Sequence, residues 1–252
     1  MIRGLRNACL LLALIAVASV AVGFALQPTV IASPPFTGPN SENAHWQILG
    51  VIVHNVDVPY KTQTTLSARD IQIARARFTD LTHSLGNMSG GRLTADVTIL
   101  EIHTPLTRLS PANATTGTNG YHASSAVVSD LIAEYVDKTD FHHVMTFLRL
   151  DIGNPWAGLY NHTLNGVHFS QIFFGAHNCN WHTQTAFPDQ VLVHEFLHGL
   201  EYESKRAGHT PICIDTHPWQ YQFGNGASGR RAFYTAMLSD PDFGFTRAAL
   251  AR

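Results

Sequence analysis

The stretch Val191-Leu-Val-His-Glu-Phe-Leu-His-Gly-Leu-Glu-Tyr202 decides how the rest of the chain has to be arranged. Its apolar residues occur nearly all round a helical turn, and this pattern is typical of a helix buried in a core. Two histidines and a glutamate lie among them, and burying these groups without partners would cost free energy. We therefore predict a buried helix whose polar side chains meet at one site. The apolar residues are Val191, Leu192, Val193, Phe196, Leu197 and Leu200.

The spacing of the polar residues favours a metal site. Residues four positions apart lie on the same face of a helix, so His194 and His198 can direct two imidazoles at one ion. Glu195 follows the first histidine directly, and its carboxylate can accept a proton from a water molecule beside the ion. Zn2+ activates water near neutral pH and polarises a carbonyl group. The pattern therefore predicts zinc-dependent hydrolysis of a peptide bond, with Glu195 as the general base.

The motif at residues 194–198 is specific, but it leaves alternatives open. With 15 histidines and 6 glutamates among 252 residues, chance would give about 0.02 matches to the pattern HExxH. One alternative is a buried helix whose histidines are satisfied by hydrogen bonds alone. Another is hydrolysis of a non-peptide amide, which would use the same atoms.

A catalytic zinc takes three protein ligands and keeps one open position for water, so one more ligand must follow the helix. His217 is the preferred candidate, because imidazole suits zinc and Pro218 would stiffen its loop. Asp215 is the alternative third ligand, and His209, close to the end of the helix, is the third candidate. Tyr221 is a candidate donor to the oxyanion of the reaction; it is also compatible with an ordinary core or surface aromatic residue.

The HExxH segment resembles the metal-binding helix of zincin-type secreted zinc metallopeptidases. This resemblance implies an α/β (α+β) fold, in which a mixed sheet is packed with helices around a central HExxH helix and a short C-terminal subdomain follows. It also implies an edge strand above the helix that pairs with the extended substrate, and Val167–Phe174 occupies the matching place in chain order. Main-chain pairing of this kind binds peptides with limited sequence demand. The same residues are also compatible with an ordinary core strand.

The residues after the motif depart from two zincin subfamilies. The metzincin pattern requires a glycine and a histidine where this chain has Glu201 and Ser204, and the thermolysin-like pattern requires a glutamate later than Glu203. Asp215 would make the site similar to the aspartate-ligand zincins, although the spacing differs. A group of uncharacterised secreted bacterial proteins is similar between about Val191 and Met237, with matches at Pro211, His217, Tyr221, Phe233 and Tyr234.

The N-terminus resembles a secretory signal peptide, which we predict over residues 1–26. Two arginines precede an apolar run from Ala8 to about Val22. The alternative is an uncleaved membrane anchor, because the apolar segment is nearly long enough to span a bilayer. The proline-containing residues 27–44 are predicted to be a linker, and residues 45–252 a single zincin-like domain. We expect the protein to be secreted or extracytoplasmic, and to stay at the cell surface if the leader is retained.

Two cysteines remain once the leader is removed. In an exported chain we predict that Cys179 and Cys213 form a disulfide. The bridge would close a loop of about 35 residues, which is worth roughly 3–4 kcal/mol on the chain-entropy model. It would tie the segment before the HExxH helix to the segment after it. The alternative makes His177, Cys179 and His182 a second metal site.

Charge and composition narrow the range of partners. The formal charge is −2, so the chain has no basic field for nucleic acid or anionic lipid. Hydrophobic residues make up 45% of the chain and charged residues 13%, which suits one domain with a sizeable core. We expect a monomer that acts on a peptide or protein substrate, with membrane contact only through the N-terminal segment. The main hypothesis is an exported zinc metalloendopeptidase, and the alternative is a zincin-fold binding or structural module without peptidase activity.

Further along the chain, strand and helix patterns alternate. This order is typical of a mixed α/β sheet with helices packed on it. The glycine-rich run 225–229 is predicted to be a turn, and the tail to Arg252 is expected to fray. The predicted strands are residues 46–56, 93–102, 143–150 and 166–175, and the predicted helices are residues 67–86, 124–136 and 230–238.

Overall fold

The computed structural model covers most of the predicted domain. The residues that it describes are 29–32, 44–111, 120–151, 157–174, 190–209, 214, 223–224, 226–246 and 250. The predicted leader and both partners of the predicted disulfide, Cys179 and Cys213, lie outside these described residues. Within the described ranges, no helix combines the length and the apolar character needed to cross a membrane.

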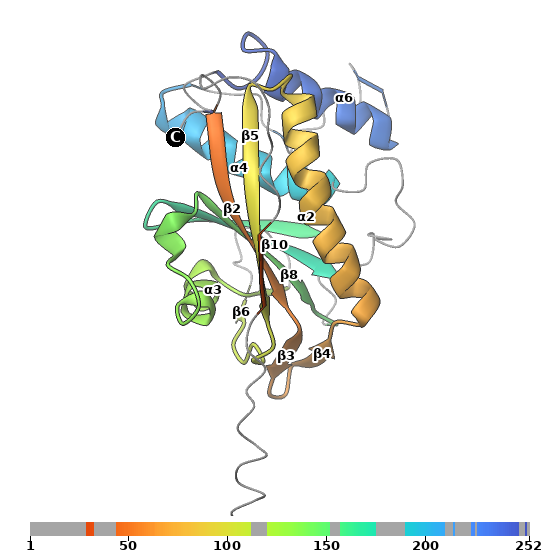
Figure 1. The fold of residues 1–252 in the computed structure, drawn as a ribbon, viewed down its shortest axis with the longest axis vertical. Helices are drawn as coiled ribbons and strands as arrows, with labels where there is room; N and C mark the ends of the chain where they lie inside the picture. The colour runs from red at the N-terminus through yellow and green to blue at the C-terminus, as the bar shows by residue number, and fades with distance from the viewer. Residues whose placement is uncertain are drawn as a thin grey trace, which may run out of the picture.

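A six-stranded mixed sheet forms the centre of the structure (Figure 1). The four inner strands are mutually parallel, and each edge strand is antiparallel to its neighbour. Parallel strands are buried on both faces and therefore have nearly continuous apolar sequences. The predicted mixed α/β fold is confirmed. In sheet order the strands are β1 (Thr29–Ala32), β5 (Leu93–Ile102), β2 (Ala44–Val53), β8 (His143–Arg149), β10 (Val167–Phe174) and β9 (Gly158–Leu164).

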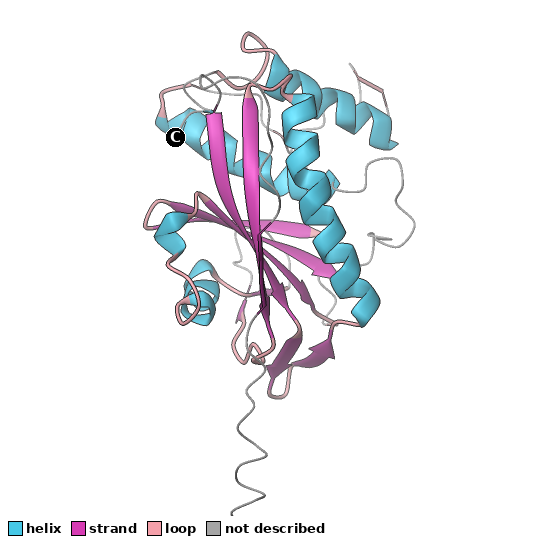
Figure 2. Cartoon of the chain, viewed as in Figure 1, coloured by secondary structure: helices cyan, strands magenta, loops and turns pink. Residues whose placement is uncertain are grey.

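Helices cover both faces of the sheet (Figure 2). One face carries α2 (Ala68–Met88), α4 (Gln190–Arg206) and α6 (Gly226–Ser239), and the other carries α3 (Ser125–Ile132). Trp46, Phe78 and Phe196 belong to the apolar layer on the first face, and Val128 belongs to the layer on the second. Figure 1 shows α2 and α3 on opposite sides of the strands. The sheet therefore separates two apolar layers, and α4 shares one of them with α2.

α2 begins at a capping box and lies directly on β2. The Ser67 hydroxyl accepts a hydrogen bond from the Asp70 backbone N–H at 3.1 Å, and the Asp70 carboxylate accepts one from the Ser67 backbone N–H at 2.9 Å. This reciprocal pairing satisfies two N–H groups at the start of the helix. A Cβ atom at Gly50 would stand 2.7 Å from the Phe78 ring. Glycine at position 50 therefore permits the close approach of the helix to the sheet.

Several short elements lie in the connections between the main strands and helices. The predicted strand 46–56 is divided at His54, which separates β2 from a second strand. That second strand is β3 (Asn55–Val58), which forms an antiparallel pair with β4 (Thr62–Thr65). The other short elements are the antiparallel pair β6 (Ser110–Pro111) and β7 (Tyr121–His122) and the 3-10 helix η2 (Lys138–Asp140).

β9 and β10 form a hairpin, and the first of these strands is not among the predicted ones. Its turn residues, Asn165 and Gly166, have φ angles of 54° and 81°, as a two-residue type I′ turn requires. The pairing shifts by one residue between His168 and Ser170, so that two residues of β9 fall opposite the single residue Phe169. This is a β-bulge with its extra residue in β9.

The hairpin changes which strand lies at the sheet edge. β10, Val167–Phe174, has β8 on one side and β9 on the other. The prediction that Val167–Phe174 is an edge strand is therefore wrong, because the Asn-Gly turn before it adds a further strand on that side. The edge strand next to α4 is β9.

Three further segments differ from the predictions. Thr29–Ala32, inside the predicted linker, pairs with β5 as an antiparallel strand. α6 begins at Gly226, within the predicted turn, because the apolar side chains later in the helix bury against the core and stabilise its first turn. The Trp46 indole N–H donates to the Leu250 carbonyl at 2.8 Å, and Leu250 is buried. The prediction of a frayed tail is wrong for this residue.

Candidate functional site

α4 extends over the same sheet face as α2 and contains the whole of the motif. Phe196 packs against Trp46, with ring centroids 5.1 Å apart. Basic residues in the last turn complement the negative end of the helix dipole. Gly208, with φ of 83°, follows the helix and donates its N–H to the Lys205 carbonyl at 3.1 Å, as glycine commonly does at a helix end. The motif therefore lies in a buried helix, as its pattern predicted.

His194 and His198 lie next to each other on α4. Their ring centroids are 4.8 Å apart, and the ring planes are inclined by 83°. Two imidazoles that bind one tetrahedral zinc at about 2.0–2.1 Å would have ring centres roughly 5 Å apart. The spacing of the two rings therefore fits a shared zinc ion. Both residues are only partly buried, unlike the apolar residues around them.

The Nδ1 atom of each histidine has an oxygen close by. His194 Nδ1 shares a hydrogen bond of 2.7 Å with the Tyr234 hydroxyl of α6. His198 Nδ1 lies 3.4 Å from Glu201 Oε2, and Lys205 Nζ donates to Glu201 Oε1 at 2.9 Å. Histidine ligands of metals are commonly held in this way through their second nitrogen. The Nε2 atoms are therefore the ones that would bind a metal.

The charge of Glu201 is fixed by its neighbours. The Glu201 side chain is 8% exposed. Its interaction with His198, followed by that with Lys205, outweighs burial and holds the pKa of the Glu201 carboxyl below its ordinary value. Glu201 is therefore a carboxylate at neutral pH, and it can keep the His198 ring oriented.

Glu195 is buried between α4 and the edge strand. It is 4% exposed, and α4 packs against β9. A Cβ atom at Gly158 would stand 2.3 Å from Glu195 Oε1 and 2.8 Å from its Cγ and Cδ. The glutamate side chain therefore lies directly against the bare Cα of Gly158, a close approach that glycine in a strand allows.

Polar side chains of the sheet continue this site beneath α4. Tyr160 of β9 stacks on His198, with ring centroids 5.8 Å apart, and its hydroxyl shares a hydrogen bond of 2.6 Å with His168 Nδ1. His168 Nε2 is 2.9 Å from Glu203 Oε1, and Arg206 donates to Glu203 Oε2 at 2.6 Å. This series of contacts joins the edge strand to the last turns of α4 and gives buried polar groups their partners.

The structure describes only some of the predicted site residues. His209 is exposed just after α4, and its backbone N–H donates to the Ser204 carbonyl at 2.9 Å. The third-ligand and oxyanion predictions are therefore left as predictions. Outside the described residues lie His217, Asp215, Tyr221 and the alternative cluster of His177, Cys179 and His182.

Tyr234, Gly158 and Tyr160 also belong to this site, although the sequence pattern did not predict their roles. Tyr234 is 40 residues from His194, and no local pattern connects the two. Its only signal in the sequence is the match to the similar secreted bacterial proteins. The strand that carries Gly158 and Tyr160 did have a signal, because Asn165-Gly166 between two β-type segments is a strong indication of a hairpin.

Comparison with known proteins assigns no family to the chain. No family model matches it, and no curated protein sequence matches it. An inference about function therefore depends on the residues of this chain and above all on the grouping of His194, Glu195 and His198 on α4.

Proposed function

We propose that the protein is an exported zinc-dependent metallopeptidase. His194 and His198 would hold the zinc, and the segment that contains Asp215 and His217 would supply the third ligand. Bound there, zinc would activate a water molecule near neutral pH and polarise the carbonyl under attack. The observation that carries this proposal is the pair of imidazoles with centroids 4.8 Å apart, directly beside the buried Glu195.

Glu195 would move the protons of the reaction. It follows His194 directly on α4, and its carboxylate would accept the proton of the attacking water. The same group would then return a proton to the leaving amine. Tyr234 and Glu201 would keep the two histidine rings in position while these transfers occur, because each lies at the Nδ1 atom of one ring.

β9 offers a surface for an extended peptide. It is an edge strand, and none of the strands in the described ranges pairs with its outer side. A peptide added as a further strand would make main-chain hydrogen bonds to β9. It would also lie near Glu195, because Gly158 of β9 is in close contact with that side chain. Recognition through the main chain implies a broad cleavage preference.

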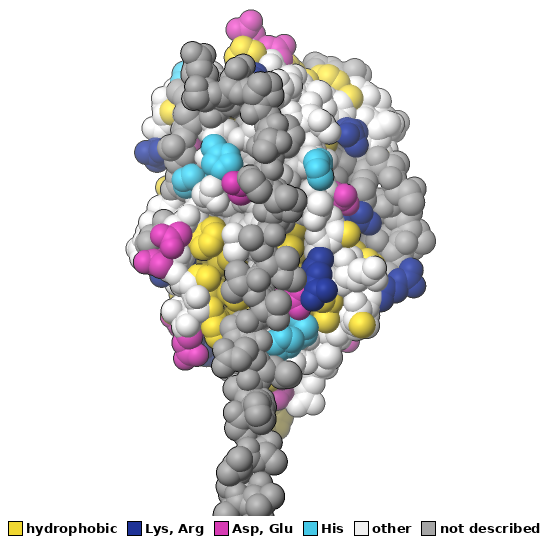
Figure 3. Space-filling model, viewed as in Figure 1, with side chains coloured by type: hydrophobic (Ala, Val, Ile, Leu, Met, Phe, Trp, Pro, Cys, Tyr) yellow, Lys and Arg dark blue, Asp and Glu magenta, His cyan; other side chains and the backbone are white. Residues whose placement is uncertain are grey.

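The charge distribution is compatible with a peptide substrate. On the face shown in Figure 3, acidic and basic side chains of the described residues are interspersed. The formal charge of the whole chain is −2. Binding to nucleic acid depends on a basic surface that neutralises phosphates. A peptide, whose backbone is uncharged, therefore suits this surface better than a nucleic acid does.

Glu195→Gln tests the proposal, because the amide keeps the shape of the side chain but cannot accept the proton. We expect zinc content equal to that of the wild type and a loss of about 10²–10⁴-fold in turnover of a peptide library. The control is the His194→Ala/His198→Ala variant, which should lose turnover together with the zinc held by α4. Equal turnover in the wild type and in Glu195→Gln would refute the assigned base. Zinc binding without turnover in the wild type would favour the binding module instead.

A further inference from the structure

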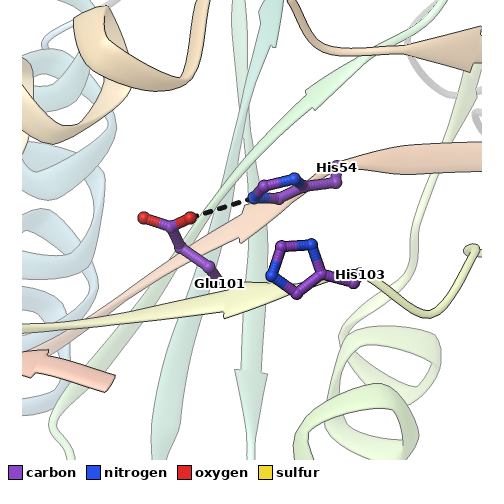
Figure 4. A group of neighbouring side chains, drawn as sticks. All are labelled: His54, Glu101 and His103. Atoms are coloured by element: carbon purple, nitrogen blue, oxygen red, sulfur yellow. Dashed lines mark hydrogen bonds and ion pairs between the residues drawn. The ribbon is translucent and has the colours of Figure 1, made fainter. Parts of the chain in front are cut away.

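A second group of metal-binding side chains lies at the carboxyl ends of β2 and β5. His54 follows the last residue of β2, and Glu101 and His103 flank Ile102, the last residue of β5. β2 and β5 are parallel neighbours, with Val53 opposite Ile102. Their ends therefore meet at one edge of the sheet. Figure 4 shows the three side chains beside one another, and we call them the β2–β5 cluster.

The cluster lies on the face of the sheet that α2 covers. Alternate residues of a strand point to the same face. Glu101 continues the buried series that includes Val97 and Ile99, which packs in the same apolar layer as α2. Arg75 of α2 reaches the cluster and contacts Glu101. The cluster thus lies at the ends of β2 and β5, whereas His198 of α4 stacks on Tyr160 of β9.

The donor atoms of the β2–β5 cluster are close enough to share one ion. His54 Nε2 is 3.0 Å from Glu101 Oε2, and the His54 and His103 ring centroids are 4.1 Å apart. One ligand atom from each of the three residues lies within 4.8 Å of the others. Ligand atoms around a tetrahedral zinc are roughly 3.3–3.6 Å apart. The His54–Glu101 pair is closer than this, and the two rings are closer than the roughly 5 Å expected of imidazoles on one zinc, so the side chains would have to rotate apart to admit the ion.

Arg75 holds the carboxylate in a suitable orientation. Its Nε donates to Glu101 Oε1 at 2.5 Å, and Oε2 is directed at His54. Carboxylates that bind metals are commonly hydrogen-bonded by a further group. Burial raises the pKa of Glu101, but the hydrogen bonds from Arg75 and His54 outweigh it, so the pKa lies below its ordinary value. Burial, helped by His54, also lowers the pKa of His103. A carboxylate and a neutral imidazole are the forms that bind metals.

We propose that His54, Glu101 and His103 form a second metal site, which binds a divalent cation of the zinc type independently of α4. Two imidazoles and one carboxylate are ligands that zinc uses, and water would complete its coordination. The ion would join the ends of β2 and β5 beside the buried carboxylate, which is 2% exposed. Because the cluster exists only in the folded chain, the ion would also stabilise the domain.

A cobalt titration of the full chain tests this site. The His194→Ala/His198→Ala background removes the α4 ligands, so that the outcome does not depend on the proposed peptidase. We expect this double variant to bind about one equivalent of Co2+ and to melt at a higher temperature when Co2+ is present. Adding His54→Ala or His103→Ala should weaken binding at least about tenfold and abolish the shift.

His45→Ala in the same background is the matched control. His45 also pairs with a carboxylate between β2 and β5, that of Asp96 at 3.2 Å, and its removal should leave Co2+ binding unchanged. Far-UV circular dichroism without metal verifies that each variant is folded, and His103→Gln replaces the alanine variants if they do not fold. The proposal is overturned if the folded double variant binds no Co2+, or if changes at His54 and His103 leave binding unaltered. The cluster would then be a metal-free ion-pair network around Arg75.

Discussion

Gly158→Ala is a test of whether Glu195 acts from the position in which it packs against β9. The added methyl group would stand 2.3 Å from Glu195 Oε1, whereas ordinary contacts at such a carbon begin at 3.4 Å. The carboxylate would therefore have to move by about 1 Å, and a misplacement of about 1 Å can cost about 10²-fold in rate. We expect kcat to fall about 100-fold, which corresponds to about 2.7 kcal/mol in the activation barrier.

Other properties of the Gly158→Ala variant should stay close to those of the wild type. The methyl group points at α4 and not along the outer side of β9, so KM for a peptide should change little. The glutamate side chain can move aside, and zinc content and melting temperature should be retained. Gly199→Ala is the matched control, because it adds the same methyl group beside His198 but meets the His143 ring at 3.4 Å, an ordinary contact. Its kcat should equal that of the wild type.

The assay is steady-state hydrolysis of a quenched fluorescent peptide by zinc-loaded protein, with zinc content and melting temperature measured on the same samples. A folded, zinc-loaded Gly158→Ala variant with wild-type kcat would refute the reasoning, because Glu195 could then not be acting from its place against β9. A loss of zinc in parallel with kcat would also contradict it, since the effect would then lie on the ligands and not on the base.

Three other predictions address the ligand sphere, the core and the response to pH. Tyr234→Phe removes the hydrogen bond to His194 Nδ1 but keeps the ring, so zinc affinity in a chelator competition should fall about 10–100-fold; unchanged affinity would show that the hydroxyl does not orient the ligand. Phe196→Ala removes a fully buried ring that packs on Trp46, and urea denaturation should show a loss of about 3–5 kcal/mol in the free energy of unfolding, whereas a loss under about 1 kcal/mol would contradict the packing. Burial lowers the pKa of His122 below its ordinary value of 6.5. The unfolded chain therefore binds a proton at His122 more readily than the folded chain does. The contribution of neutral His122 to the free energy of unfolding is fully present above pH 6.5 and is lost as the pH falls. Between about pH 7.5 and about pH 5, the melting temperature of His122→Gln should therefore fall less than that of the wild type. An equal fall in the two proteins would disprove this contribution.

The strongly patterned elements could be predicted from the sequence, and the edge of the sheet could not. The sequence predicts Leu93–Ile102 with the bounds that the structure has, because apolar and polar residues alternate along most of this strand and the alternate side chains are buried. β9, Gly158–Leu164, contains polar residues among its half-buried ones, and its bulge interrupts the alternation of the two faces. The usual strand signal is therefore weak in β9, and only the turn that follows it identifies it.

The candidate site could be predicted only where its residues are neighbours in sequence. His194, Glu195 and His198 lie within two turns of one helix, so helical geometry alone brings them together. Tyr234 reaches His194 only because α6 packs in the same apolar layer as α4, and Gly158 reaches Glu195 only because the hairpin adds β9 to the sheet. Contacts of this kind depend on tertiary packing, which local periodicity does not encode.

The extra residue of the β9 bulge determines which face of the sheet the residues before the bulge point to. Changing a strand by one residue exchanges its two faces, and the bulge lies between the hairpin turn and Tyr160. With it, Gly158 is paired with Ile172 and faces Glu195, while Leu159 packs in the opposite apolar layer. With the same bulge and one residue more between the turn and Tyr160, Leu159 would take the place opposite Ile172, and its branched side chain would occupy the space of the carboxylate. Insertion of a single codon between the turn and Tyr160 would thus displace Glu195 although every residue of α4 stayed the same.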